Sequence, residues 1–182
     1  MLIPAGYMLK RVYAETAWLK SRHIADIHSV SNCISSNFAD YIGYWLHNGY
    51  WLFNRPSDME KILAQESISR DGLTLFYYEI YEHQFDEETM SWCAVAPEAS
   101  FELRVEEPPH ARLKGFDVVT FWSGAAPECS PLSCNSLADE LHVNEHCLFA
   151  TLQDAKEALE QGKFNGSEPG PFRIFAVYAV DV

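Results

Sequence analysis

The 182-residue chain is long enough to bury a substantial core, and its 48% hydrophobic and 21% charged residues exclude intrinsic disorder. Its 26 acidic and 13 basic side chains give a net charge of −13, which disfavours nucleic-acid binding because phosphate backbones repel such a surface. No segment approaches the roughly 20 consecutive apolar residues of a membrane helix, and no secretory pattern opens the chain. We therefore expect a cytoplasmic protein without membrane association.

The first half of the chain predicts both helices and strands. Residues 37–45 carry apolar side chains at the three- and four-residue spacing of an amphipathic helix. Ser57 followed by Glu60 matches a capping box, which predicts a second helix running to about residue 65. Aromatic and β-branched side chains predict strands over 50–53 and 73–82, while 8–13 and 24–30 fit either short strands or irregular segments.

The second half contains a clear helix signal. Thr151 with Asp154 at the third position predicts where this helix starts, and Gly162 predicts where it ends. A shorter helix is expected over 135–141. Runs of apolar residues between turn residues predict strands over 91–96, 101–106, 116–122 and 172–180, the first two forming a hairpin.

Part of the first half recurs about half a chain later at constant spacing. The matching pairs are Asn48 and Asn144, Leu52 and Leu148, Phe53 and Phe149, Asp58 and Asp154, and Leu63 and Leu159. We therefore expect an α+β fold of two similar β-α-β-containing halves, residues 1–88 and 89–182, packed as one unit, and we hypothesise an internal duplication. The alternative is that unrelated strand–helix–strand units share Leu and Phe at such positions.

A cluster of cysteines and histidines in the second half offers ligands for a metal. Thiolate and imidazole are the donors that zinc prefers, and Cys129, Cys134, His142 and His146 supply four of them. The spacing does not match a known zinc motif, because Glu145 adjoins the second histidine of the pair rather than the first. We therefore expect no metal and no other cofactor, and we keep these four residues as candidate ligands.

The same cluster contains candidate catalytic residues. Cys129 or Cys134 could act as a nucleophile if it lies at a helix N-terminus, where backbone N–H groups lower a thiol pKa. His142 or His146 would then serve as the base, with Glu128 or Asp139 as the carboxylate that orients it. The alternative is that these cysteines pack as small hydrophobic side chains.

Residues 41–53 are unusually aromatic. Tyrosine, tryptophan and asparagine give interfaces rigid contact area with hydrogen-bonding ends. The alternative is that the rings build the core. The candidate binding residues are Tyr44, His47, Asn48, Tyr50 and Trp51.

Two functions remain open from the sequence, and whether the chain is an enzyme is undecided. Gly49-Tyr50-Trp51-Leu52-Phe53 followed by a capped acidic helix resembles segments of small bacterial proteins, some of which are immunity partners of toxins. That resemblance covers one short segment and assigns no family. Together with the acidic charge, it favours a non-enzymatic, immunity- or antitoxin-like module that binds a basic protein. The alternative is a thiol- or metal-dependent enzyme centred on Cys129, Cys134 and His146.

Overall fold

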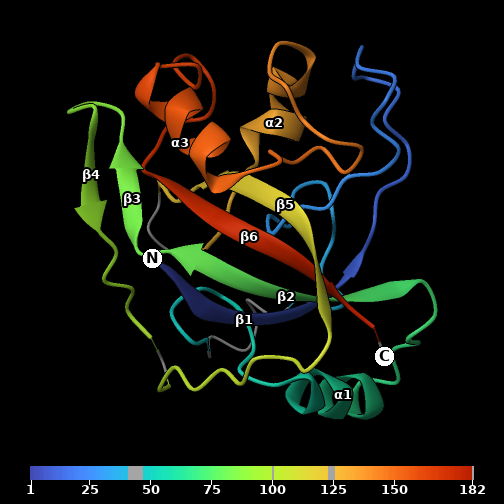
Figure 1. Ribbon diagram of the computed structural model, residues 1–182. Coiled ribbons are helices and arrows are strands. Elements are labelled where there is room, and N and C mark those ends of the chain that lie inside the picture. Colours follow the sequence, from blue (N-terminus) through green and yellow to red (C-terminus); the bar gives the residue numbers. More distant parts are fainter. Residues whose placement is uncertain (41–46, 100, 123–125, 182) are drawn as a thin grey trace.

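The computed structural model describes residues 1–40, 47–99, 101–122 and 126–181 (Figure 1). This part of the chain is a mixed fold that consists mainly of a six-stranded antiparallel sheet with three α-helices. The strands are β1 (Leu2–Arg11), β2 (Leu73–Tyr81), β3 (His83–Asp86), β4 (Ser91–Ala94), β5 (Ala111–Thr120) and β6 (Phe172–Val180). The helices are α1 (Pro56–Gln65), α2 (Pro131–Cys134) and α3 (Leu152–Glu160), with a 3₁₀ turn over Leu137–Asp139.

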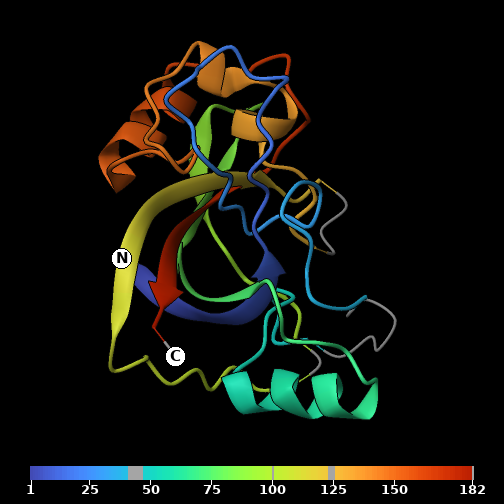
Figure 2. The same cartoon turned by 90° about the vertical axis from the view of Figure 1, so that its right-hand side faces the viewer.

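Strand β6 lies in the middle of the sheet. It pairs with β5 along one edge and with both β2 and β3 along its other edge. Beyond these, β1 pairs with β2, and β4 pairs with β3. The sheet is strongly curved, with α1 below it and α2 and α3 above it in the view of Figure 2. No helix in the described residues is long and apolar enough to span a membrane.

Several local predictions are confirmed. Strand β6 has the predicted bounds, and β2 and α1 lie within a residue of theirs. Thr151 accepts a hydrogen bond from the Asp154 N–H and completes a capping box at the start of α3. Gly162 follows this helix with a φ of +69°, a left-handed conformation that suits glycine.

Other local predictions are wrong. Residues 101–106 form no strand, and β4 pairs with β3 instead, in a hairpin whose turn lies between Asp86 and Ser91. The expected strand over 50–53 is reduced to an isolated bridge, and residues 24–30 contain one such bridge. Helix α1 has no side-chain cap at Arg55. The expected helix over 37–45 falls partly on residues 41–46, which lie outside the described part, and residues 37–40 are not helical.

A glycine and an asparagine shape the outer edge of β1. A β-bulge places Gly6 at a φ of +137°, where an added Cβ would lie 2.7 Å from the Phe53 carbonyl oxygen. Asn48 donates its side-chain N–H to the Ala5 carbonyl at 2.7 Å, and its Oδ1 accepts hydrogen bonds from two N–H groups of its own loop. The loop therefore closes the free edge of β1, where Tyr7 and Phe53 exchange both backbone hydrogen bonds.

The outer edge of β5 has the same arrangement. Gly115 follows a bulge at a φ of +147°, and an added Cβ would lie 2.6 Å from the Phe149 carbonyl oxygen. The Asn144 side-chain N–H donates a hydrogen bond to the Lys114 carbonyl at 2.6 Å, and its Oδ1 accepts hydrogen bonds from two N–H groups of its own loop. The outer edges of β1 and β5 are thus each closed by one asparagine-centred loop that leads into a helix and then into a strand of the sheet.

Candidate functional site

The aromatic segment before α1 contributes chiefly to the core. Asn48, Tyr50 and Trp51 are all buried, and Tyr50 packs edge-on against Phe175. His47 is half-buried and stacks on Trp51 with ring centroids 4.1 Å apart. Tyr44 lies outside the described residues. These burials leave little of the predicted binding surface accessible to a partner.

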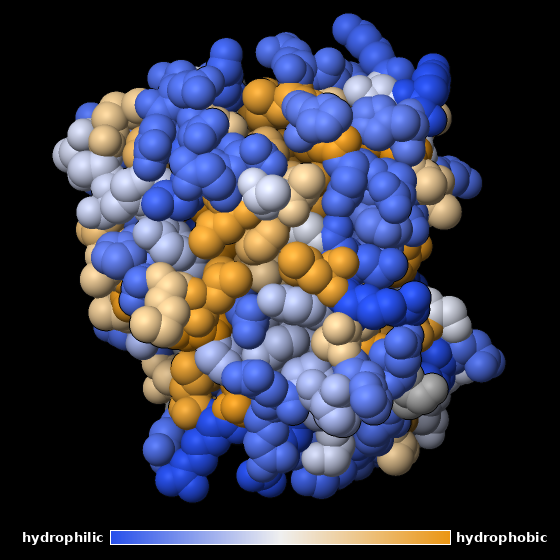
Figure 3. Space-filling model, viewed as in Figure 1, coloured by the Kyte–Doolittle hydropathy of each residue, from blue (hydrophilic) through white to orange (hydrophobic). Residues whose placement is uncertain are grey.

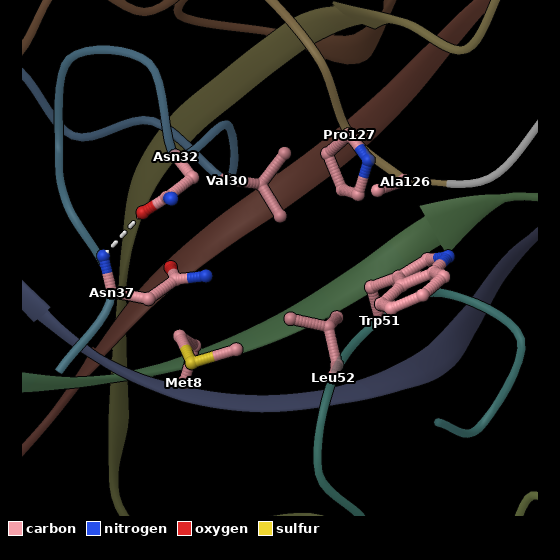
Figure 4. A pocket seen from close by; sticks show the side chains of 8 residues that line it. All are labelled: Met8, Val30, Asn32, Asn37, Trp51, Leu52, Ala126 and Pro127. Atoms are coloured by element: carbon pink, nitrogen blue, oxygen red, sulfur yellow. Dashed lines mark hydrogen bonds between the residues drawn. The ribbon is translucent and has the colours of Figure 1, made fainter. Parts of the chain in front are cut away.

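A small enclosed pocket lies beside this segment (Figure 4). Met8, Trp51 and Leu52 line it from one side, while Ala126 and Pro127 approach from the second half of the chain. Its volume of about 40 Å³ accommodates a few water molecules rather than an organic ligand. We therefore assign no ligand to it.

The structure separates the cysteines of the predicted cluster from its histidines. Cys129 and Cys134 are close enough to Cys33 for the three thiols to shift one another's pKa. Cys33 is exposed, Cys134 is half-buried and Cys129 is buried, and all five cysteines of the chain are free thiols. His142 is exposed on another part of the surface. The sequence had indicated neither the convergence of these thiols nor the involvement of Cys33.

The three thiols differ in acidity. Hydrogen bonding from the Cys129 thiol, together with that from Cys33, lowers the pKa of Cys134 to about 6. Burial and the neighbouring Cys134 raise the pKa of Cys33 to about 11. Cys134 is therefore the member of this cluster whose pKa is lowered, and it lies beside a shallow pocket lined by Tyr13 and Trp18.

His146 belongs to a different cluster. Its Nδ1 lies 2.6 Å from Oδ1 of Asp26, and Nε2 of His28 lies 3.2 Å from the other oxygen of that carboxylate. The two imidazole rings stack with centroids 4.2 Å apart. Within the described residues, this is the group of His, Cys, Asp and Glu side chains whose ligand atoms lie together closely enough to hold a metal ion.

Two buried charged groups fix the segment that carries His28. The Lys10 ammonium donates to the carbonyls of Val30 and Ser31 at 2.9 and 2.7 Å. From the other side, the Asp117 carboxylate accepts hydrogen bonds from the Ser29 hydroxyl and the Val30 N–H. Burial lowers the pKa of Lys10 to about 7 and raises that of Asp117 to about 6. This segment is therefore held rigidly against both β1 and β5.

A row of three tyrosines crosses the sheet. Tyr7 of β1 pairs with Tyr77 of β2, which pairs in turn with Tyr178 of β6, with ring centroids 5.2 and 5.5 Å apart. Leu113 of β5 continues the row and is 48% exposed. The row results from strand register, because these residues are far apart in the sequence.

Three glutamates surround this row. We call the six residues together the tyrosine groove: Tyr7, Tyr77, Tyr178, Glu79, Glu106 and Glu107. Tyr178 donates its hydroxyl to Glu79 at 2.6 Å, and Tyr7 donates to the Glu106 carbonyl. Burial, followed by the charges of Glu106 and Glu107, raises the pKa of Tyr7 to about 12. Burial together with Glu79 and Glu107 also raises the pKa values of the other two tyrosines.

The tyrosine groove opens beside the first turn of α1. Tyr7, Glu106 and Glu107 line this pocket together with Pro56 and Val180, and Arg55 is the one basic residue among those that line it. On the sheet face of Figure 1, hydrophobic side chains form a broken band across the middle, between hydrophilic side chains above and below (Figure 3). The surface is therefore partly apolar and locally negative.

Comparison of the chain with models of protein families, with curated proteins and with solved structures found no match.

Proposed function

We propose that the protein is a non-enzymatic binding module that captures a basic protein partner through the tyrosine groove. The observation that carries this proposal is the pocket lined by exposed Glu106 and Glu107 at one end of the tyrosine row, in which Tyr7 and Tyr77 are buried and Tyr178 is half-buried. Carboxylates pair with lysine and arginine, and these two glutamates offer such pairs to a basic partner. An immunity- or antitoxin-like role is one form that such binding takes.

The charge of the whole molecule supports the proposal. A net charge of −13 steers a basic partner toward the surface and raises the association rate. The groove then supplies the local contacts that a diffuse charge lacks. We propose a cytoplasmic location, which the free thiols fit because the cytoplasm keeps cysteines reduced.

We further propose that the two halves arose by internal duplication. A Cβ added at Gly6 or at Gly115 would meet equivalent atoms of the two asparagine-centred loops, at distances that agree within 0.1 Å. Both loops also contain one non-glycine residue with a φ near +60°, Trp51 in the first and Cys147 in the second.

A thiol-dependent activity is the second candidate. It is favoured by Cys134, which has a lowered pKa and lines an open pocket next to exposed Cys33. His146 is not placed to act as its base in this conformation, because it clusters with Asp26 and His28 and not with the three thiols. The candidate therefore depends on the thiol cluster alone.

The test of the main proposal is binding of a fluorescently labelled oligo-arginine peptide at about 0.1 M salt. In the groove variant, Glu106 and Glu107 are both replaced by glutamine. In the control variant, exposed Glu15 and Glu140 are replaced in the same way, which removes the same charge elsewhere. Each exposed ion pair contributes about 0.5–1 kcal/mol, so the groove variant should bind about tenfold more weakly.

The comparison between the two variants decides the outcome. The control variant should retain wild-type affinity to within about twofold, because its charges are far from the pocket and are screened beyond about 10 Å at 0.1 M salt. Equal weakening in both variants would show that the peptide responds only to net charge. That result would contradict the proposal.

A further inference from the structure

The group formed by Asp26, His28 and His146 has the composition of a metal site. Each residue offers a ligand atom, and these atoms all lie within 4.8 Å of one another. Both imidazoles direct a ring nitrogen toward the same carboxylate, at 2.6 and 3.2 Å. Two imidazole nitrogens and one carboxylate oxygen are a common ligand set for zinc and for other first-row transition metals.

The backbone holds these side chains in place. The N–H groups of Ala25 and Asp26 both donate to the Glu145 carbonyl, at 2.8 and 3.3 Å. The His28 N–H donates to the His146 carbonyl at 3.2 Å. The two segments that carry the candidate ligands are therefore joined by backbone hydrogen bonds beside the group.

His28 carries an unexplained buried polar atom. Its side chain is only 7% exposed, and its Nδ1 has no hydrogen-bond partner among the described residues. Burial also lowers the pKa of His28 to about 4, so the ring is neutral at physiological pH. The ring nitrogen of His28 that faces the Asp26 carboxylate is Nε2, and its lone pair is available to a metal when the ring proton lies on Nδ1.

The group occurs in only one of the two similar loops. His146 follows Asn144 in the second loop at the position that Tyr50 occupies after Asn48 in the first. Tyr50 is 2% exposed and packs in the core, whereas His146 turns toward Asp26. The shared loop geometry therefore does not require a histidine here.

We propose that Asp26, His28 and His146 bind a divalent transition-metal ion such as zinc. The ion takes the place of the protons between the carboxylate and the two rings, and the side chains of Asp26 and His146, which are 27% and 16% exposed, leave one position open to water. The Glu145 carboxylate lies 3.7 Å from Nε2 of His146, on the outer side of the group. This site is independent of the tyrosine groove.

The test is titration of chelator-treated full-length protein with Zn²⁺, followed by calorimetry and by NMR of the imidazole nitrogens. The wild type should bind one equivalent and shift the resonances of His28 and His146, a readout that requires no substitution. Asp26→Asn and His146→Gln should each weaken binding by about 100-fold or more. His142→Gln, which alters an exposed histidine outside the group, should bind Zn²⁺ like the wild type.

A further variant separates this site from the thiol cluster. Cys33→Ser/Cys134→Ser should retain the binding, and Co²⁺ bound to the wild type should show ligand-field bands without a thiolate charge-transfer band. Circular dichroism of each metal-free variant checks that it is folded. The proposal is overturned if the wild type binds no zinc, if the imidazole resonances do not move, or if the cysteine variant loses the binding.

Discussion

Replacing Gly6 by alanine should destabilise the protein strongly, because this glycine of β1 packs directly against the first asparagine-centred loop. Its φ of +137° is unfavourable for any residue with a Cβ, at a cost of about 1–3 kcal/mol. The new Cβ would also lie 2.7 Å from both the Leu52 Cβ and the Phe53 carbonyl oxygen, and relieving this overlap costs about 1–3 kcal/mol more. Alanine also lowers the conformational entropy of the unfolded chain, which offsets about 0.4–1 kcal/mol of this destabilisation. The expected loss is therefore about 2–5 kcal/mol.

The assay is urea unfolding followed by circular dichroism, with two comparisons. Gly115→Ala should lose a similar amount, because its Cβ would meet equivalent atoms at 2.6 and 2.7 Å. Gly72→Ala is the control, since Gly72 also has a positive φ but no atom lies within 4 Å of its added Cβ. That variant should lose only about 1–2 kcal/mol from backbone strain. Our reasoning about close packing fails if Gly6→Ala and Gly72→Ala have the same free energy of unfolding.

Three further predictions follow from the buried and titrating groups. At pH 7 Cys134 should react with iodoacetamide faster than exposed Cys93, because its pKa is lowered to about 6; peptide mapping that finds Cys93 labelled first would contradict this. The pKa of Tyr7 is raised from 10.0 to about 12, so its contribution to stability is complete below pH 10 and is lost as pH rises toward 12. In Tyr7→Phe the free energy of unfolding should therefore fall less between pH 10 and pH 12 than in the wild type. The same pH profile in both proteins would argue against this role of Tyr7. Lys10→Met leaves the buried Asp117 charge without its nearest cation and should cost about 3–5 kcal/mol in urea unfolding, whereas a loss below 1 kcal/mol would refute this role.

Elements with strong local signals could be predicted from the sequence. The capping box from Thr151 to Asp154 and the apolar run over 172–180 depend on neighbouring residues, and both were located correctly. The hairpin expected over 91–106 was wrong because β4 found its partner in β3, on the preceding side. A short strand signal does not specify which of two neighbouring strands it pairs with.

The candidate sites depend on long-range contacts that no local pattern reveals. His146 was recognised as a chemically promising residue, but its contact with Asp26 spans 120 positions of the chain. One signal was available: in an extended segment, Asp26 and His28 lie on the same face because side chains alternate. The tyrosine groove gave no such signal, since its three rings meet only through the register of three strands.

The most direct test of the proposed function is NMR mapping of the oligo-arginine peptide on the isotope-labelled protein. We expect the largest amide and aromatic shifts at Tyr7, Tyr178 and Glu107, with smaller changes near Arg55 on the opposite wall of the pocket. Saturable shifts confined to this region would support capture of a basic partner by the groove. Weak shifts spread over all acidic surfaces, or a cluster of shifts elsewhere, would contradict it.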